Sequence, residues 1–354
     1  MGVLRTLLAI VVVCAHSAYG PVFLGGPLTV QVFYLISGFL NAHILRTNPA
    51  YADTRLFYVN RLLRLLPIYY LTAGLTAVYV LFIDHTVITT FLHAPLAAQV
   101  LLSVSQITVV GMDWIMFLGV RHEHLALVSD FHYSSPPLWR ALLVPQAWSL
   151  GVEVSFYAIA PFVLRSSRVM LPLFVLSCAV RVATIAYGIG HADPWTYRFF
   201  PSELAIFLLG ALSRAHLLPV LQQHIPGQTR RLAATLGTAV LIAACVTYPA
   251  MPLPDDIKPY LLLLVSAALL PLSFMYQQAS RMDRAIGELS YPIYITHMLV
   301  IWVLAAVLAR NQIHLSALSK TMAAVLLTCA FAWVLNRTVS VKVERLRSRL
   351  GSQQ

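Results

Sequence analysis

Arg5 and His16 are two ionisable residues within the first apolar stretch of the chain. They stand eleven positions apart, which on an α-helix places them about 20° apart around the axis and about 16 Å apart along it. Ionisable groups inside a membrane are costly, so a functional role is the default interpretation. We expect His16 to act as a base deep in the first span, with Arg5 at its cytosolic end. The alternative is a topology anchor and a hydrogen-bonded core histidine.

Arg61 and Arg64 lie one helical turn apart, and Tyr58 lies one turn earlier, so all three should project from one side of a helix. Two neighbouring guanidinium groups form a fork that suits phosphate oxygens. Coenzyme A carries a pyrophosphate and a 3′-phosphate, so the pattern predicts a clamp for a cytosolic acyl-CoA donor at Tyr58, Arg61 and Arg64. Ordinary positive charge on the cytoplasmic side, in contact with lipid phosphates, is the alternative.

Glu153 is a lone carboxylate in an apolar run that opens at Trp148. It follows Ser149 by four residues and precedes Tyr157 by four, so the three share one helical face. A carboxylate in such a run must find a partner or take up a proton. We expect Glu153 to orient His16 or to bind an acceptor hydroxyl, with Tyr157 as a candidate substrate-binding residue. A structural ion pair with an arginine is the alternative.

Ser290, Tyr294 and His297 recur at i, i+4 and i+7 in a late apolar segment, which places three polar groups on one stripe of a helix. Tyr294 and His297 are therefore candidate substrate-binding residues. In the second apolar segment, Ser37 and Gly38 are small residues that favour close helix packing, and we assign them no chemistry.

The elements that position these residues follow from composition. The chain has 354 residues, of which 59% are hydrophobic and only 10% are charged, against about 25% charged residues in a soluble domain. Each membrane crossing takes about 20 apolar residues. The sequence therefore predicts an all-α, polytopic bundle of transmembrane helices. The candidate segments are 4–20, 28–45, 66–83, 95–118, 148–164, 169–189, 202–213, 232–249, 259–276, 290–309 and 319–338.

The basic residues indicate the topology. Lys and Arg number 24 against 13 acidic residues, and the arginines gather in short loops at alternate segment ends, as in cytoplasmic loops. Between Arg64 and Arg165 there are three apolar segments, although two crossings are required. We therefore expect about ten crossings, cytoplasmic termini, and one re-entrant or interfacial segment between 84 and 147. The polar residues that could line an external cavity there are His85, His93, Asp113, His122, Glu123, His124, Asp130 and His132.

Other classes of site are not indicated. No basic run is interleaved with exposed aromatic residues, so no nucleic-acid partner is expected. The cysteines lie singly in apolar segments, so we expect no disulfide framework and no metal site. Residues 1–20 have features of a signal peptide, but we expect an uncleaved first span. We divide the chain into a membrane-embedded catalytic domain, 1–340, and a basic cytoplasmic tail, 341–354.

Six segments resemble, in order, the acyltransferase-3 family of membrane acyltransferases, which includes O-antigen and exopolysaccharide acetylases. They lie at 4–16, 30–39, 61–67, 148–157, 201–211 and 290–297 and extend over nearly the whole chain. The resemblance implies that His16 takes part in acyl transfer, that Arg5 supports it, and that Arg61 and Arg64 contact coenzyme A. Gln31 and Val154 stand where many members have acidic residues.

These observations predict a membrane acyltransferase for groups other than aminoacyl groups. It would move an acyl group, expected to be acetyl, from cytosolic acyl-CoA to a hydroxyl of a glycan or lipid-linked saccharide. No permanently bound cofactor is expected; the partners would be acyl-CoA, the saccharide and membrane lipids, in a bacterial inner membrane. No esterase-like domain follows the bundle, so we expect a standalone enzyme. A transporter or flippase for a polysaccharide intermediate is the alternative, although we find no internal repeat of the transporter kind.

Overall fold

The chain folds into a helical bundle. A computed structural model describes residues 1–352, with side chains to residue 347, and in this range eight helices are long and apolar enough to cross a membrane. This confirms the all-α, polytopic fold. The helices of these spans are α2 (Gly25–Thr47), α3 (Thr54–Phe82), α7 (Ser167–Ala186), α8 (Phe200–Leu212) with α9 (Leu218–His224), α10 (Gly227–Thr247), α11 (Lys258–Ala279), α12 (Arg281–Gly287) with α13 (Ser290–Arg310), and α14 (Ala317–Leu335) with α15 (Val341–Ser352).

Two shorter apolar helices, α1 (Gly2–Ala15) and α6 (Trp148–Val163), belong to the same bundle. α1 packs against α2, α12 and α13, and α6 packs against α2, α3 and α8. α1 ends earlier than the expected segment 4–20 because Ser17 bonds back to the Val13 carbonyl, and Gly20 then adopts a φ of +93° just before Pro21. The first helix therefore ends with His16 at its C-terminal cap.

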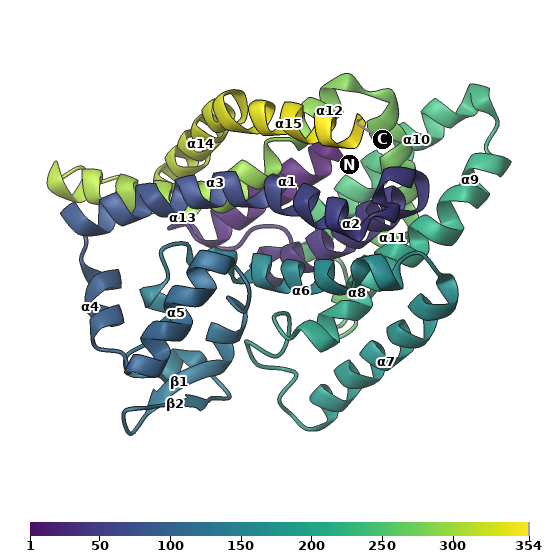
Figure 1. Cartoon of the computed structure of the whole chain (residues 1–354). Helices are drawn as coiled ribbons and strands as arrows, with labels where there is room; N and C mark the ends of the chain where they lie inside the picture. Colours follow the sequence, from purple (N-terminus) through teal and green to yellow (C-terminus); the bar gives the residue numbers. More distant parts are fainter. Residues whose placement is uncertain (353–354) are drawn as a thin grey trace.

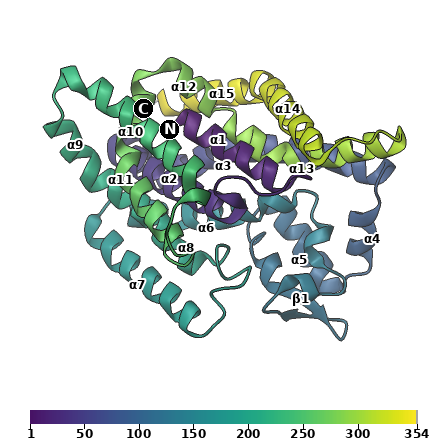
Figure 2. The same cartoon turned by 180° about the vertical axis from the view of Figure 1, so that it is seen from behind.

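The two ends of the chain lie close together at one end of the bundle, beside α12 and α15 (Figures 1 and 2). The expected cytoplasmic loops also meet: Arg46 Nε donates to the Leu164 carbonyl at 2.8 Å, and an Arg165 Nη donates to the Tyr51 carbonyl at 2.6 Å. Termini on one side require an even number of crossings. The eight long helices of the described residues are an even number, whereas α1 and α6, with 14 and 16 residues, are shorter than the roughly 20 residues that a crossing takes.

The region between α3 and α6 forms a small lobe at the opposite end of the bundle (Figure 1). It contains α4 (Thr86–Leu92), α5 (Leu96–Thr108) and an antiparallel hairpin of β1 (Leu118–Arg121) and β2 (His124–Leu127). His122 and Glu123 form the hairpin turn, with φ of 48° and 63°. α5 has 13 residues, fewer than the roughly 20 that a crossing takes. The expected segment 95–118 is therefore too short, as a helix, to cross.

α2 and α8 cross with their backbones very close together. A Cβ atom added at Gly38 would lie 1.8 Å from the Phe207 carbonyl oxygen, and one added at Gly210 would lie 1.9 Å from the Leu35 carbonyl oxygen. The two backbones are thus in direct contact, which small residues permit in membrane helices. This agrees with the packing role that the sequence suggests for Gly38.

Candidate active site

A cavity of about 100 Å3 lies among α1, α2, α3, α6 and α13, and is called the central cavity below. It contains six of the residues that the sequence singles out for chemistry. Its charged and hydroxyl- or amide-bearing side chains are Arg5, Tyr34, Ser37, Asn41, Arg61, Arg64, Ser149, Glu153, Tyr157, Ser290, Tyr291 and Tyr294.

The Glu153 carboxylate is held by two hydroxyl groups. Its Oε1 accepts a hydrogen bond from Tyr157 at 2.5 Å, one turn along α6, and another from Ser37 Oγ of α2 at 2.8 Å. Among the described residues no arginine lies within ion-pair distance of Glu153, and no hydrogen bond joins it to His16. The carboxylate is therefore positioned at the cavity wall by α2 and α6 together.

The arginine side chains converge on the same cavity. Asp53 caps α3 by accepting from the Arg55 amide, so Arg61 and Arg64 lie about two and about three turns inside the helix. Arg61 is only 5% exposed, and its Nε has no hydrogen-bond partner. A buried guanidinium with unpaired donors is energetically costly. An anion entering the cavity would satisfy it.

Arg5 is positioned by the start of α1. Asp283 of α12 accepts hydrogen bonds from the Gly2 and Val3 amides at 2.8 Å each, which fixes the end of the helix. Arg5 then donates to Ser290 Oγ, also at 2.8 Å. The expected face of α1 is thus oriented toward α13.

Tyr58 does not line the central cavity. Its hydroxyl donates to the Ala158 carbonyl at 2.8 Å, and its ring packs against Phe57. Six residues along an α-helix amount to a rotation of about 240°, so Tyr58 is displaced by about 120° from Arg64. A spacing of three residues keeps two side chains on one face of a helix, but two such steps in succession rotate the third side chain away from that face.

His16 and His297 lie side by side, with ring centroids 5.0 Å apart. His16 Nδ1 is 2.9 Å from the Val12 carbonyl, and His297 Nδ1 is 2.6 Å from the Tyr294 carbonyl. A carbonyl oxygen can only accept, so each Nδ1 carries a proton and, in the neutral ring, each Nε2 has a free lone pair. His297 is fully buried and its Nε2 has no partner, whereas His16 is exposed at the end of α1.

Tyr294 connects the two histidines with the central cavity. Its ring centroid is 5.9 Å from that of His297, and its hydroxyl lies 2.6 Å from Ser149 Oγ. The hydroxyl also donates to the Gln146 carbonyl at 3.2 Å. Polar groups therefore follow one another from the arginines, past Glu153, to the imidazole pair.

Several cavity residues are not found by sequence reasoning. Tyr34, Ser37 and Asn41 of α2 all line the cavity, and Tyr291 joins them from α13. The first three recur at i, i+3 and i+7, a polar stripe that could have identified this face of α2. The Ser37 side chain thus contributes a hydrogen bond to the site, beyond the packing that we expect of it.

The polar residues of the lobe between α3 and α6 lie outside the central cavity. The reason is that this segment folds on itself as short helices and a hairpin instead of entering the bundle. Asp113 is the buried member: it is 3% exposed, packs against Gly151 of α6, and its Oδ1 has no partner. Burial raises the pKa of the Asp113 carboxyl to about 6.

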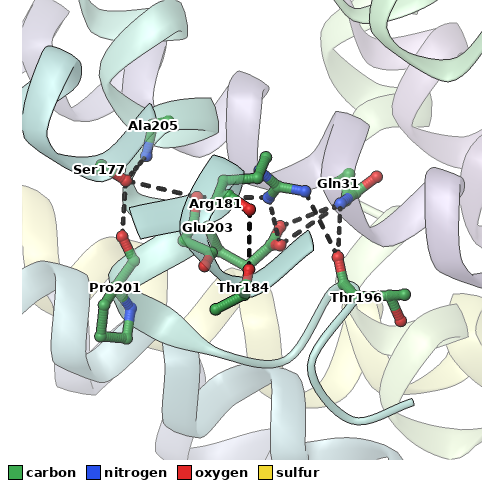
Figure 3. A network of polar contacts seen from close by, with 9 residues as sticks. Gln31, Ser177, Arg181, Thr184, Thr196, Pro201, Glu203 and Ala205 are labelled. Carbon is green, nitrogen blue, oxygen red and sulfur yellow. Dashed lines mark hydrogen bonds and ion pairs between the residues drawn. The ribbon is translucent and has the colours of Figure 1, made fainter. Parts of the chain in front are cut away.

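A separate polar network, outside the lining of the central cavity, joins α2, α7 and α8 (Figure 3). Glu203 of α8 is fully buried and accepts from Arg181 of α7 at 2.5 Å and from the Gln31 amide of α2 at 3.2 Å. Ser177 donates to the Pro201 carbonyl at 2.6 Å. The neutral Gln31 is suited to this place because an acidic residue there would repel Glu203. We regard the network as structural.

Comparisons with known proteins show the family to which the chain belongs. A family model described as an acyltransferase domain matches residues 1–337. The putative peptidoglycan O-acetyltransferase YrhL of Bacillus subtilis is 27% identical over 78% of this chain and 44% of its own length. The peptidoglycan O-acetyltransferase OatA of Listeria monocytogenes is 24% identical over 87% of this chain and 50% of its own.

An uncharacterised protein of Aquifex aeolicus is 26% identical over 61% of this chain and 94% of its own length. The chain thus spans about half the length of the two O-acetyltransferases that it matches. No solved structure matches it significantly. The family model, however, covers nearly the whole bundle. The expectation of an acyltransferase is confirmed, and the chain belongs to the acyltransferase family of membrane proteins.

Proposed function

We propose that this chain transfers an acyl group, acetyl in the simplest case, from cytosolic acyl-CoA to a hydroxyl of a glycan on the other side of a bacterial inner membrane. The observation that supports this most is the run of polar groups through the bundle. Arginines, among them Arg61 with its unpaired Nε, lie at one end of the run, and two imidazoles with free lone pairs lie at the other.

The donor enters from the side that holds the termini and the basic loops, which the positive-inside rule makes cytoplasmic. Arg61 and Arg64 bind its phosphates through charge-assisted hydrogen bonds. The acyl-bearing arm then lies in the central cavity, past Glu153, with the thioester near Tyr294.

The acceptor meets the thioester at His16. The Nε2 lone pair of His16 takes the proton of the acceptor hydroxyl as its oxygen bonds to the thioester carbonyl carbon. The carbon–sulfur bond then breaks, and the proton on Nε2 passes to the departing thiolate. The Tyr294 hydroxyl is within the cavity and can donate to the carbonyl oxygen as negative charge develops there. His297 supports the orientation of His16.

The acceptor class follows from the relatives. Both curated O-acetyltransferases that the chain matches are named for peptidoglycan, so a cell-envelope glycan is the acceptor that we propose. A lipid-linked saccharide would present the same hydroxyl chemistry at the membrane surface.

A transfer assay tests the proposal. The purified chain in nanodiscs receives radiolabelled acetyl-CoA and soluble peptidoglycan fragments, and acetylated product is counted. We expect His16→Ala to lower the rate by roughly 10²- to 10⁴-fold, the contribution of a positioned base, with unchanged acetyl-CoA binding. His224→Ala, which replaces an exposed histidine of α9, is the matched control.

Two results would contradict the mechanism. Full activity of His16→Ala would remove His16 from the reaction. A stable label on His16 when acetyl-CoA is supplied without acceptor would show that His16 forms an acyl-histidine intermediate and does not act only as a base.

A further inference from the structure

A second cavity, of about 520 Å3, is lined by residues of α1, α3, α12, α13 and α15, and we call it the vestibule. α12 and α15 lie beside the termini at one end of the bundle (Figure 1). Arg5, Arg64 and Tyr291 line both the vestibule and the central cavity. The two spaces therefore adjoin, and a long ligand could occupy both. This places the vestibule on the path by which a donor would enter the central cavity.

The vestibule is strongly basic. Five arginines line it against two acidic residues, so its walls favour an anion. α3 and α1 supply Arg64 and Arg5, and α12 supplies Arg284, whose Nη1 donates to backbone carbonyls of α11. Glu288 follows at the end of α12, and α15 supplies Glu344, Arg345 and Arg347.

α15 is attached to the helix that carries the arginine pair. Arg347 Nη2 donates to Asn60 Oδ1 of α3 at 2.7 Å, and Asn60 directly precedes Arg61. The Arg347 side chain is 13% exposed, its other amino group pairs with Glu344, and its Nε is buried without a partner. The helix begins at Val341, beyond the residues 1–337 that the family model matches.

We propose that α15 is the outer wall of the donor site and that Arg347 binds the phosphates of the nucleotide end of acyl-CoA. This inference rests on the proposed function, because it requires a coenzyme A donor. The pyrophosphate and 3′-phosphate need several donors at once, and Arg61 and Arg64 alone form a single fork. Arg347 adds a guanidinium to the vestibule beside Arg64 of α3.

Lipid head groups also carry phosphates, and the vestibule lies at an end of the bundle where they would be found. The binding test therefore uses nanodiscs of neutral lipid, repeated with anionic phosphatidylglycerol. The ligands are acetyl-CoA, 3′-dephospho-acetyl-CoA and acetyl-pantetheine, which carry progressively fewer phosphates. The full chain is used throughout.

We expect Arg347→Gln to weaken acetyl-CoA binding roughly tenfold or more, since a hydrogen bond to a charged group contributes about 1.5–3 kcal/mol. Binding of acetyl-pantetheine should not change. Arg347→Lys should recover part of the affinity. The matched control is Lys342→Gln, which removes an exposed charge from the same helix at a position that does not line the vestibule.

The outcomes separate this inference from the proposed function. If Arg347→Gln binds acetyl-CoA as the wild type does, while Arg61→Gln with Arg64→Gln does not, α15 is no part of the donor site and the proposed function stands. If none of these variants changes binding, both are refuted. If Arg347→Gln lowers only the retention of phosphatidylglycerol, the vestibule binds lipid and the inference is overturned. A chain truncated after Ser340 repeats the test should Arg347→Gln unfold.

Discussion

Gly38 offers a direct test of the packing that holds the cavity. A Cβ at this position would lie 1.8 Å from the Phe207 carbonyl oxygen, whereas real Cβ atoms essentially never come within 3.0 Å of another atom. The neighbour is backbone, so no side-chain rotation relieves the contact. In Gly38→Ala, α2 and α8 must therefore separate by more than 1 Å, the difference between these distances.

The cost can be estimated from overpacking. Adding a methyl group to a well-packed interior costs about 1–3 kcal/mol, and the gain in helix propensity from Gly to Ala returns up to about 1 kcal/mol. We expect Gly38→Ala to unfold at a lower temperature than the wild type. Ser37 moves with its neighbour, so its 2.8 Å hydrogen bond to Glu153 should lengthen and transfer activity should fall as well.

Gly74 of α3 is the matched control, because a Cβ added there meets nothing within 4 Å. Gly74→Ala should keep or raise stability, by up to about 1 kcal/mol from helix propensity alone. Thermal unfolding of the two variants in the same detergent, followed by near-ultraviolet circular dichroism, measures the difference. If Gly38→Ala unfolds at or above the temperature of Gly74→Ala, the close crossing of α2 and α8 is refuted.

Two further predictions concern buried charge. Arg181→Leu leaves the Glu203 carboxylate buried with Gln31 as its remaining side-chain donor, and should destabilise the fold by about 3–5 kcal/mol. Adding Glu203→Leu should restore much of the unfolding temperature. If it does not, the unpaired Glu203 charge is not the cause of the destabilisation. The raised pKa of Asp113, about 6 against an ordinary 3.8, means that its protonated form is favoured by folding. The stabilisation from this protonated carboxyl is full below about pH 4 and is lost as the pH rises through 6, by on the order of 3 kcal/mol. Asp113→Asn should therefore make the unfolding temperature less dependent on pH between pH 4 and 7. If the dependence on pH is the same as in the wild type, Asp113 is not its source.

The bundle could be predicted from the sequence because length and hydropathy alone decide which segments can cross a membrane. The ends of the elements could not. Segment 66–83 is part of a helix that starts at Thr54, since Asp53 provides a cap that an apolar window does not detect. α1 ends at Ala15 because local hydrogen bonds and Gly20 stop it, although apolar residues continue beyond.

Within the site, contacts along one helix could be predicted and contacts between helices could not. The pairing of Glu153 with Tyr157 follows from their spacing of four. The bond from Ser37 to the same carboxylate depends on how α2 packs against α6, which no local pattern specifies. The same limit applies to His16 and His297, which are far apart in the sequence and adjacent in the bundle.

The lobe between α3 and α6 shows a different limit. Its histidines and acidic residues stand out against an apolar sequence, and they suggest a polar cavity. A polar residue at the end of the bundle can instead be solvated, as His122 and Glu123 are in an exposed turn. For the residues of this turn, exposure removes the cost that makes an ionisable residue inside a membrane a sign of function.

That distinction also separates the two kinds of arginine in this chain. Arg181 is paired with Glu203 at 2.5 Å, so its charge is neutralised within the protein and its role is to join helices. Arg61 is buried to 5% exposure with its Nε unpaired and with no carboxylate within ion-pair distance among the described residues. Folding alone would favour a partner for Arg61, because an uncompensated buried charge costs several kcal/mol. Because no carboxylate among the described residues is paired with it, the Arg61 guanidinium is available to bind the phosphates of the proposed donor.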